Sequence, residues 1–321
     1  MATALLRPTR CVRSQRPWLL RAMSSAKPVL PEAQVMEVNG RYNVKYVDVR
    51  PASASESPTI VLIHGAPGSH NDFKHLIPLL QSKARVIGIN LPGNGGSEVR
   101  ADKYYEHVRA IDLARTALDT VRQLCSKDEP VFVLGHSFGG HATLNLAAMN
   151  EESKDVNLRG LALIASAGLR PHKALQPRTN AIAWQMLRSN VEAIERFAHW
   201  LVKFAYVKVL KFPANAPTDH YVAGIVRCAT TEFPVVKAHV DRVRHIPTFF
   251  AWARDDAFME EEIFLELSEE LHPGPRFAFN RGGHNIQKTK ATFLADRLLA
   301  WTNAVISDDK TVHSKEIEVH P

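Results

Sequence analysis

The sequence predicts an α/β fold in which helices cover both faces of a mostly parallel β-sheet. Short runs of continuously apolar residues, each long enough for one strand, alternate with segments in which apolar residues recur at helical spacing. Strands that are apolar on both sides are typical of a parallel sheet buried between helices. The composition agrees, since 45% hydrophobic and 23% charged residues in 321 are ordinary for a globular protein.

The elements follow one another in a regular order. Residues 35–38 and 42–49 flank Asn39-Gly40, which is the turn signal of a β-hairpin. Apolar residues at helical spacing predict a helix over 108–124. The runs expected to form buried strands are 59–63, 85–90, 131–135, 158–165, 247–253 and 276–279.

The interval 168–245 interrupts this alternation. It contains several helical patterns and no clear buried strand, so we expect a helical cap inserted between two strands. Its most apolar part, 197–213, carries three lysines that do not share one face of a helical wheel, as a membrane-surface helix would require. We therefore expect this part to pack over a pocket. Its aromatic residues either line an apolar pocket or form the cap's own core: Trp184, Phe197, Trp200, Phe204, Tyr206, Phe212, Tyr221 and Phe233.

Positive charge is concentrated in the leader, residues 1–31. Six of its residues are basic and none is acidic, so the formal charge of +7 for the whole chain leaves +1 for residues 32–321. A nearly neutral folded part argues against nucleic acid as a partner. An arginine-rich, acid-free leader is typical of a mitochondrial transit peptide, and Arg21-Ala22-Met23-Ser24 resembles a matrix-protease cleavage site. We expect the mitochondrial matrix, with the cytoplasm as the alternative.

The expected domain organisation follows from these segments. The core comprises residues 32–167 and 246–306, the cap comprises 168–245, and the polar residues 307–321 are expected to form a disordered tail. No apolar run reaches the roughly 18 residues of a transmembrane helix. Outside the leader, Cys125 and Cys228 form neither a disulfide framework nor a metal-binding pair, so we expect a reducing compartment.

The strongest chemical signal is the segment Gly135–Gly140, which reads G-H-S-F-G-G. It follows an apolar run and precedes a helical pattern, which is the strand–turn–helix setting that the motif G-x-S-x-G requires. The turn lifts the hydroxyl of Ser137 clear of the sheet. Side chains two positions away on either side would collide there, which explains Gly135 and Gly139. The helix N-terminus behind Ser137 favours developing negative charge.

With this motif the chain resembles the α/β-hydrolase superfamily, in its cap-bearing branch, over about residues 33–305. The segment 64–68 (HGAPG) resembles that branch's oxyanion loop, and 91–97 (LPGNGGS) resembles its D-x-P-G-x-G-x-S segment. The resemblance implies an eight-stranded sheet with a helical cap. Two positions depart from the family pattern: Asn90 occupies the position of the usual aspartate, and Asn94 occupies that of the usual histidine.

The superfamily order of serine, acid and histidine implies the other catalytic residues. The acid should follow the strand 247–253, where Asp256 fits the family pattern better than its neighbour Asp255. The histidine should follow the last strand, where Gly282-Gly283 precedes His284. The predicted triad is therefore Ser137, Asp256 and His284.

Backbone N–H groups of Ala66 and Phe138 are expected to form the oxyanion hole, supported by His64 and Gly65. The sequence has no HExxH motif and no paired-histidine metal spacing, so we expect neither metal nor cofactor.

These residues predict a serine hydrolase that cleaves a carboxylic ester, thioester or lactone through an acyl-enzyme. Its partner would be a small acyl substrate. Ser137 argues against epoxide hydrolases and haloalkane dehalogenases, which use aspartate at that position. The alternatives are a catalytically silent binding protein on the same fold, and a carbon–carbon bond hydrolase or acyltransferase. The oligomeric state stays open.

Overall fold

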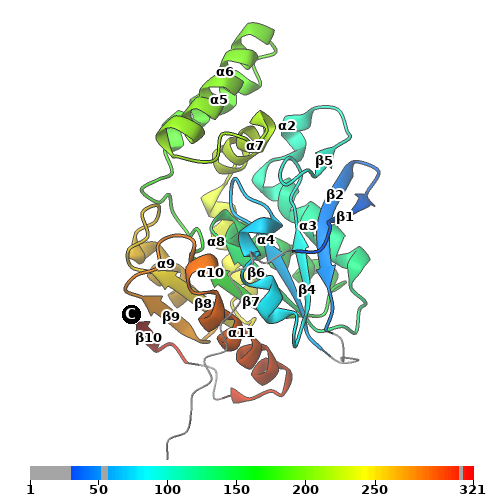
Figure 1. The fold of residues 1–321 in the computed structure, drawn as a ribbon, viewed down its shortest axis with the longest axis vertical. Coiled ribbons are helices and arrows are strands. Elements are labelled where there is room, and N and C mark those ends of the chain that lie inside the picture. Colours follow the sequence, from blue (N-terminus) through cyan, green and yellow to red (C-terminus); the bar gives the residue numbers. More distant parts are fainter. Residues whose placement is uncertain (1–29, 52–56, 311–313) are drawn as a thin grey trace, which may run out of the picture.

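A computed structural model describes residues 30–51, 57–310 and 314–321 (Figure 1). The leader predicted to be a transit peptide, residues 1–31, lies outside the described residues except for its last two positions. Within the described part, no helix is both long enough and apolar enough to cross a bilayer.

The sheet is mostly parallel, as predicted. Its strand order is β1-β2-β4-β3-β6-β7-β8-β9-β10, and β5 pairs with β2 off this path. All pairings from β4 to β10 are parallel, whereas β2 pairs antiparallel with β1, β4 and β5. The strands are β1 (Gln34–Val38), β2 (Tyr42–Val49), β3 (Thr59–Ile63), β4 (Arg85–Ile89), β5 (Glu98–Val99), β6 (Val131–His136), β7 (Leu158–Ile164), β8 (Thr248–Ala253), β9 (Arg276–Phe279) and β10 (Ile317–His320).

Helices cover both faces of the sheet, and the central strand β3 shows why four of its five residues, 60–63, are apolar. Val61 and Ile63 belong to the core beneath α3 (Ala110–Leu124) and α4 (Phe138–Ser153). Ile60 and Leu62 belong to the opposite core beneath α1 (Ile77–Leu80) and α11 (Ala291–Ile306). Alternate residues of a strand face opposite sides, so a strand covered on both sides is apolar on both of its faces. The covering helices and short helical turns are η1 (His70–Phe73), α1 (Ile77–Leu80), α2 (Tyr104–His107), α3 (Ala110–Leu124), α4 (Phe138–Ser153), α9 (Glu261–Glu270), α10 (Ile286–Thr289) and α11 (Ala291–Ile306).

The sheet has ten described strands, where the family resemblance implied eight. One extra strand, β10, lies within 307–321, which we expected to be a disordered tail. Its backbone pairs with the edge strand β9, and the N–H of Asn280 donates to the carbonyl of His320 (2.8 Å). The ring of His320 also packs on Phe293, with centroids 4.5 Å apart. The polar composition of the tail gave no sign of a strand, because β10 is held by backbone hydrogen bonds to β9, which is distant in sequence.

The interval between β7 and β8 is helical, with α5 (Pro177–Leu187), α6 (Glu192–Phe204), a π-helical turn η2 (Ala205–Val209), α7 (Thr218–Ala229) and α8 (Phe233–Val243). Within 168–245, α8 differs from the other helices because it packs on α4 as part of the layer that covers the sheet. Figure 1 shows α5 and α6 at one end of the long axis, beyond α7.

The three aromatic residues of α6 contradict our expectation of a pocket lining or a cap core. Phe197, Trp200 and Phe204 have 52%, 58% and 45% of their surfaces exposed. Tyr206 and Tyr221, in contrast, are buried and stack on each other. The expectation was wrong because the buried face of α6 is formed by two small residues, Ala198 and Val202. In the sequence, the larger aromatic residues of the same helix dominate the apolar pattern.

Candidate active site

Ser137 occupies a strained turn between β6 and α4. Its φ of 57° and ψ of −128° lie outside the regions that L-residues ordinarily occupy. Its backbone is held by hydrogen bonds on both sides, since its N–H donates to the carbonyl of Ile164 (3.1 Å) and its carbonyl accepts from Gly140 (2.9 Å). The turn therefore places Ser137 at the carboxyl end of β6, where open α/β sheets bind ligands.

The two glycines of the motif have no room for a side chain. A Cβ on Gly135 would lie 2.4 Å from the carbonyl oxygen of Gly139, and a Cβ on Gly139 would lie 2.2 Å from that of Ile63. The obstructing atoms belong to the backbone, so no side-chain rotation relieves the clash. Close approach of β6, α4 and β3 thus accounts for both glycines.

Asp256 and His284 are brought together at the carboxyl ends of β8 and β9. His284 Nδ1 lies 2.7 Å from Asp256 Oδ2, and the Asp256 side chain is fully buried. Its other oxygen accepts the N–H groups of Phe258 (2.7 Å) and Met259 (3.1 Å). Burial alone raises the pKa of Asp256, but the hydrogen bond and charge of His284, with the two N–H groups, outweigh it and hold that pKa below its ordinary value. An ionised Asp256 only accepts, so Nδ1 of His284 carries the proton.

Asp255 has a different position from its neighbour. Its carboxylate accepts the N–H groups of Gly282 (2.9 Å) and Gly283 (2.7 Å), which directly precede His284. It therefore braces the loop that carries the imidazole, whereas Asp256 contacts the imidazole itself.

His284 lies beside the serine turn. Its carbonyl accepts a hydrogen bond from His136 Nε2 (2.9 Å), and the two rings are 4.9 Å apart. Burial lowers the pKa of His136 to about 3, so His136 is neutral. This contact links the residue that precedes Ser137 to the loop that carries His284.

The predicted oxyanion loop lies against the serine. A Cβ on Gly65 would be only 3.0 Å from the Cβ of Ser137 and 3.4 Å from its Oγ. Phe138 is the first residue of α4, where a backbone N–H has no helical acceptor. The loop carrying Ala66 and the start of α4 therefore converge on Ser137.

His64 supports this loop as a neutral ring. Its Nδ1 donates to the carbonyl of Gly65 (2.7 Å), and its Nε2 accepts the N–H of Leu91 (3.0 Å). Burial, reinforced by the charge of Arg227, lowers the pKa of His64 to about 3. Both ring nitrogens are thus committed to holding the backbone.

The two asparagines that depart from the family pattern also hold the backbone here. Asn90 Oδ1 accepts the backbone N–H of His70 (2.7 Å), and its amide nitrogen donates to the carbonyl of Gly95 (2.9 Å). Asn94 Oδ1 accepts the N–H of Gly68 at 3.4 Å. The local network therefore forms with amides in place of the usual aspartate and histidine.

Sequence reasoning missed Arg227, a buried arginine of α7 with 3% of its surface exposed. Its guanidinium donates to three backbone carbonyls, those of His64 (3.2 Å), Gly65 (3.2 Å) and Phe138 (2.7 Å). Burial lowers its pKa to about 10, so it stays charged at neutral pH. The sequence feature that could have indicated a buried arginine is that Arg227 is the one charged residue in the apolar run 221–229.

Two further imidazoles surround Phe138. The rings of His141 and His172 lie 5.4 Å and 5.7 Å from its ring. Each donates one N–H to a carbonyl, at Gly168 (2.7 Å) and Phe258 (3.0 Å), so the other nitrogen is an acceptor. Those acceptors, His141 Nδ1 and His172 Nε2, are buried and without a partner. Two imidazole nitrogens without a hydrogen-bond donor therefore belong to rings that pack around Phe138.

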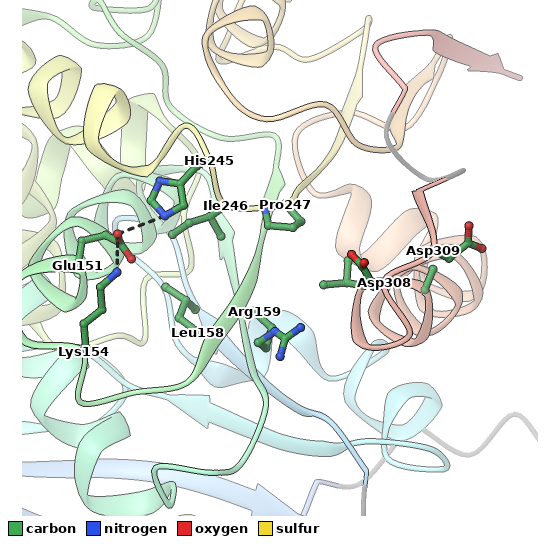
Figure 2. Close-up of a pocket in the computed structure, with 11 residues that line it drawn as sticks. Glu151, Lys154, Leu158, Arg159, His245, Ile246, Pro247, Asp308 and Asp309 are labelled. Atoms are coloured by element: carbon green, nitrogen blue, oxygen red, sulfur yellow. Dashed lines mark ion pairs between the residues drawn. The ribbon is translucent and has the colours of Figure 1, made fainter.

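A separate pocket of about 280 Å³ lies at the opposite end of the strands (Figure 2). Leu158 and Pro247, at the amino ends of β7 and β8, line it, and Glu151 pairs there with Lys154 and His245. It contains none of the predicted catalytic residues. Among the described residues, no group of three His, Cys, Asp or Glu side chains is placed to hold a metal ion.

A mostly parallel sheet with helical layers and a serine on a strained strand–helix turn defines the α/β-hydrolase class. A family described as "Alpha/beta hydrolase of unknown function (DUF1057)" matches residues 31–316, and the chain belongs to it. The recognition of the superfamily from sequence is thereby confirmed.

Similar proteins span most of the chain. An uncharacterised protein of Caenorhabditis elegans is 25% identical over 305 residues, covering 84% of this chain and 83% of its own. A pimeloyl-[acyl-carrier protein] methyl ester esterase of Vibrio campbellii is 27% identical over 245 residues (72% and 89%). The solved esterase of Exiguobacterium antarcticum superposes with a TM-score of 0.64 at 13% identity (85% and 100%), which shows a shared fold.

Proposed function

We propose that this α/β hydrolase is a serine hydrolase that cleaves a carboxylic ester, thioester or lactone through an acyl-enzyme. The observation that carries the proposal is the 2.7 Å contact between His284 and the buried Asp256, in a loop hydrogen-bonded to the residue that precedes Ser137. The likeness to a methyl ester esterase supports it.

In the first half-reaction, Ser137 Oγ attacks the acyl carbonyl and its proton passes to His284 Nε2, which is unprotonated because Nδ1 holds the proton facing Asp256. The N–H groups of Ala66 and Phe138 stabilise the oxyanion, and each such donor contributes about 3 kcal/mol in the transition state. His284 then protonates the leaving alcohol or thiol as the acyl–oxygen or acyl–sulfur bond breaks.

In the second half-reaction, His284 removes a proton from water, which attacks the acyl-enzyme and releases the acid. Asp256 holds the imidazole in the required tautomer throughout and stabilises the imidazolium.

A fluorophosphonate probe tests this proposal, with wild type compared with Ser137→Ala by intact mass and peptide mapping. One adduct, mapped to Ser137 and absent from the folded variant, is expected. It would justify a panel of nitrophenyl esters, acyl thioesters and lactones. A folded wild type that takes no adduct would instead favour the silent binding protein, and activity only on carbon–carbon substrates would overturn the ester assignment.

A further inference from the structure

Helix α6 and its neighbours expose an apolar surface that no part of the described chain covers. Among the described residues, twelve large hydrophobic side chains are exposed, and nine of them lie between residues 182 and 210. Single exposed hydrophobic residues are normal on a soluble protein, but a concentrated patch indicates an interaction site. We call this surface the cap face; it comprises Ile182, Val191, Ile194, Phe197, Trp200, Leu201, Phe204, Val209 and Leu210.

The cap face is ordered along one side of α6. Phe197, Trp200 and Phe204 follow one another at helical spacing, and their rings stack with centroids 5.7 Å and 5.4 Å apart at angles of 24° and 22°. The opposite side of the helix, with Ala198 and Val202, is buried. The helix therefore uses its small residues for its own packing and presents its largest ones outward, at the far end of the molecule (Figure 1).

Positive charge accompanies the cap face. Residues 177–216 contain six basic and two acidic residues, a net charge of +4, whereas the rest of residues 32–321 sums to −3. Both acids are engaged, since Glu192 pairs with Arg196 and Glu195 accepts the hydroxyl of Tyr105. The basic residues are Arg178, Arg188, Arg196, Lys203, Lys208 and Lys211.

From this combination we infer that the cap face docks on an anionic phospholipid membrane surface. Aromatic side chains on one face of a helix, with lysine and arginine beside them, are the features of helices that lie in the membrane interface. Nearby basic residues each add about 1 kcal/mol of attraction to an anionic leaflet. A second copy of the chain is a poorer occupant, because a two-fold contact would bring the two sets of cations together.

This assignment replaces the expectation that residues 197–213 pack over a pocket. The lysines do not need to share one helical face, because α6 ends at Phe204, Lys208 lies within the π-helical turn η2, whose wider turn changes the angular spacing, and Lys211 lies beyond η2. The segment 197–213 is therefore not one straight helix, which a single helical wheel assumes.

Vesicle flotation of the full chain tests the proposal. Wild type is expected to float with mixed phosphatidylcholine–phosphatidylglycerol vesicles and much less with phosphatidylcholine alone. The triple variant Phe197→Ser, Trp200→Ser, Phe204→Ser should partition at least about tenfold more weakly. The matched control Val35→Ser, Ile306→Ser, Val319→Ser removes three large exposed hydrophobic residues that lie outside the cap face in the described part of the chain, and it should bind as wild type does.

All variants keep the basic leader, so their differences report on the cap face alone. Brominated phospholipids should quench Trp200, and its contribution is the part of the quenching that Trp200→Phe removes. Trp252 and Trp301 are buried, so the quenching that remains in this variant is that of Trp18 in the leader and the half-buried Trp184 of α5. Equal flotation of a folded triple-serine variant and wild type would assign binding to the leader and overturn the proposal. So would a stable dimer that the triple substitution dissociates without any flotation of wild type, or equal binding to uncharged vesicles.

Discussion

Replacing Arg227 with methionine tests how the cap helix α7 supports the serine site. The guanidinium donates to three carbonyls, two in the predicted oxyanion loop and one at the start of α4. Methionine fills a similar volume and donates no hydrogen bond, so the three carbonyls lose their partner. We expect the loss to affect both stability and the reactivity of Ser137.

The magnitude follows from these three contacts. Hydrogen bonds to a charged group contribute about 1.5–3 kcal/mol each, so the gross loss is about 5–9 kcal/mol. Burying the guanidinium costs several kcal/mol in wild type, and the variant avoids that cost, so the net loss in unfolding free energy is about 2–4 kcal/mol. Losing one oxyanion donor slows a reaction about 10²–10³-fold, and displacing one is expected to slow acylation about 10–100-fold.

Urea unfolding and the second-order rate of fluorophosphonate labelling measure the two effects. Arg227→Lys keeps the charge but reaches fewer carbonyls, so it should fall between wild type and Arg227→Met. Arg100→Met, which breaks an exposed pair with Glu37, is the control and should change stability by at most about 1 kcal/mol. If Arg227→Met labels at the wild-type rate and unfolds at the wild-type urea concentration, the positioning role of Arg227 is refuted.

Three further predictions concern the triad, the serine turn and the leader. Asp256→Asn should slow labelling about 10³–10⁴-fold, and Asp255→Asn much less. Because the folded pKa of Asp256 is depressed, its contribution to stability is present above the unfolded value of about 3.9 and is lost as pH falls through the folded value. The difference in unfolding free energy between wild type and Asp256→Asn should therefore shrink on acidification; a constant difference would contradict this. Gly139→Ala should destabilise the fold by more than about 2 kcal/mol, since its Cβ meets the Ile63 carbonyl, and an unchanged melting temperature would contradict the packing argument. We also propose that residues 1–31 direct mitochondrial import; a fluorescent protein fused to them should enter mitochondria and should stay outside when the leader arginines are glutamine.

Much of the fold could be predicted because its strands are locally recognisable. The runs at 59–63 and 131–135 are apolar without interruption, and each forms a central strand of the sheet. The edge strands were harder, since β5 has two residues and β10 is polar. Short or polar strands show no recognisable alternation of apolar and polar residues, so only their pairing with a neighbouring strand identifies them.

The sequence by itself determined the fold class and the motif around Ser137, because strand apolarity, turn glycines and motif order act over a few residues. Only the tertiary structure decided that Asp256 contacts His284 while Asp255 braces the loop, since adjacent carboxylates look alike until a residue 28 positions away is placed. It also decided that Arg227 reaches backbone 163 positions away and that the aromatic residues of α6 face outward. Burial and pairing are properties of the assembled chain, because each depends on what packs opposite the residue, and that partner is far away in sequence.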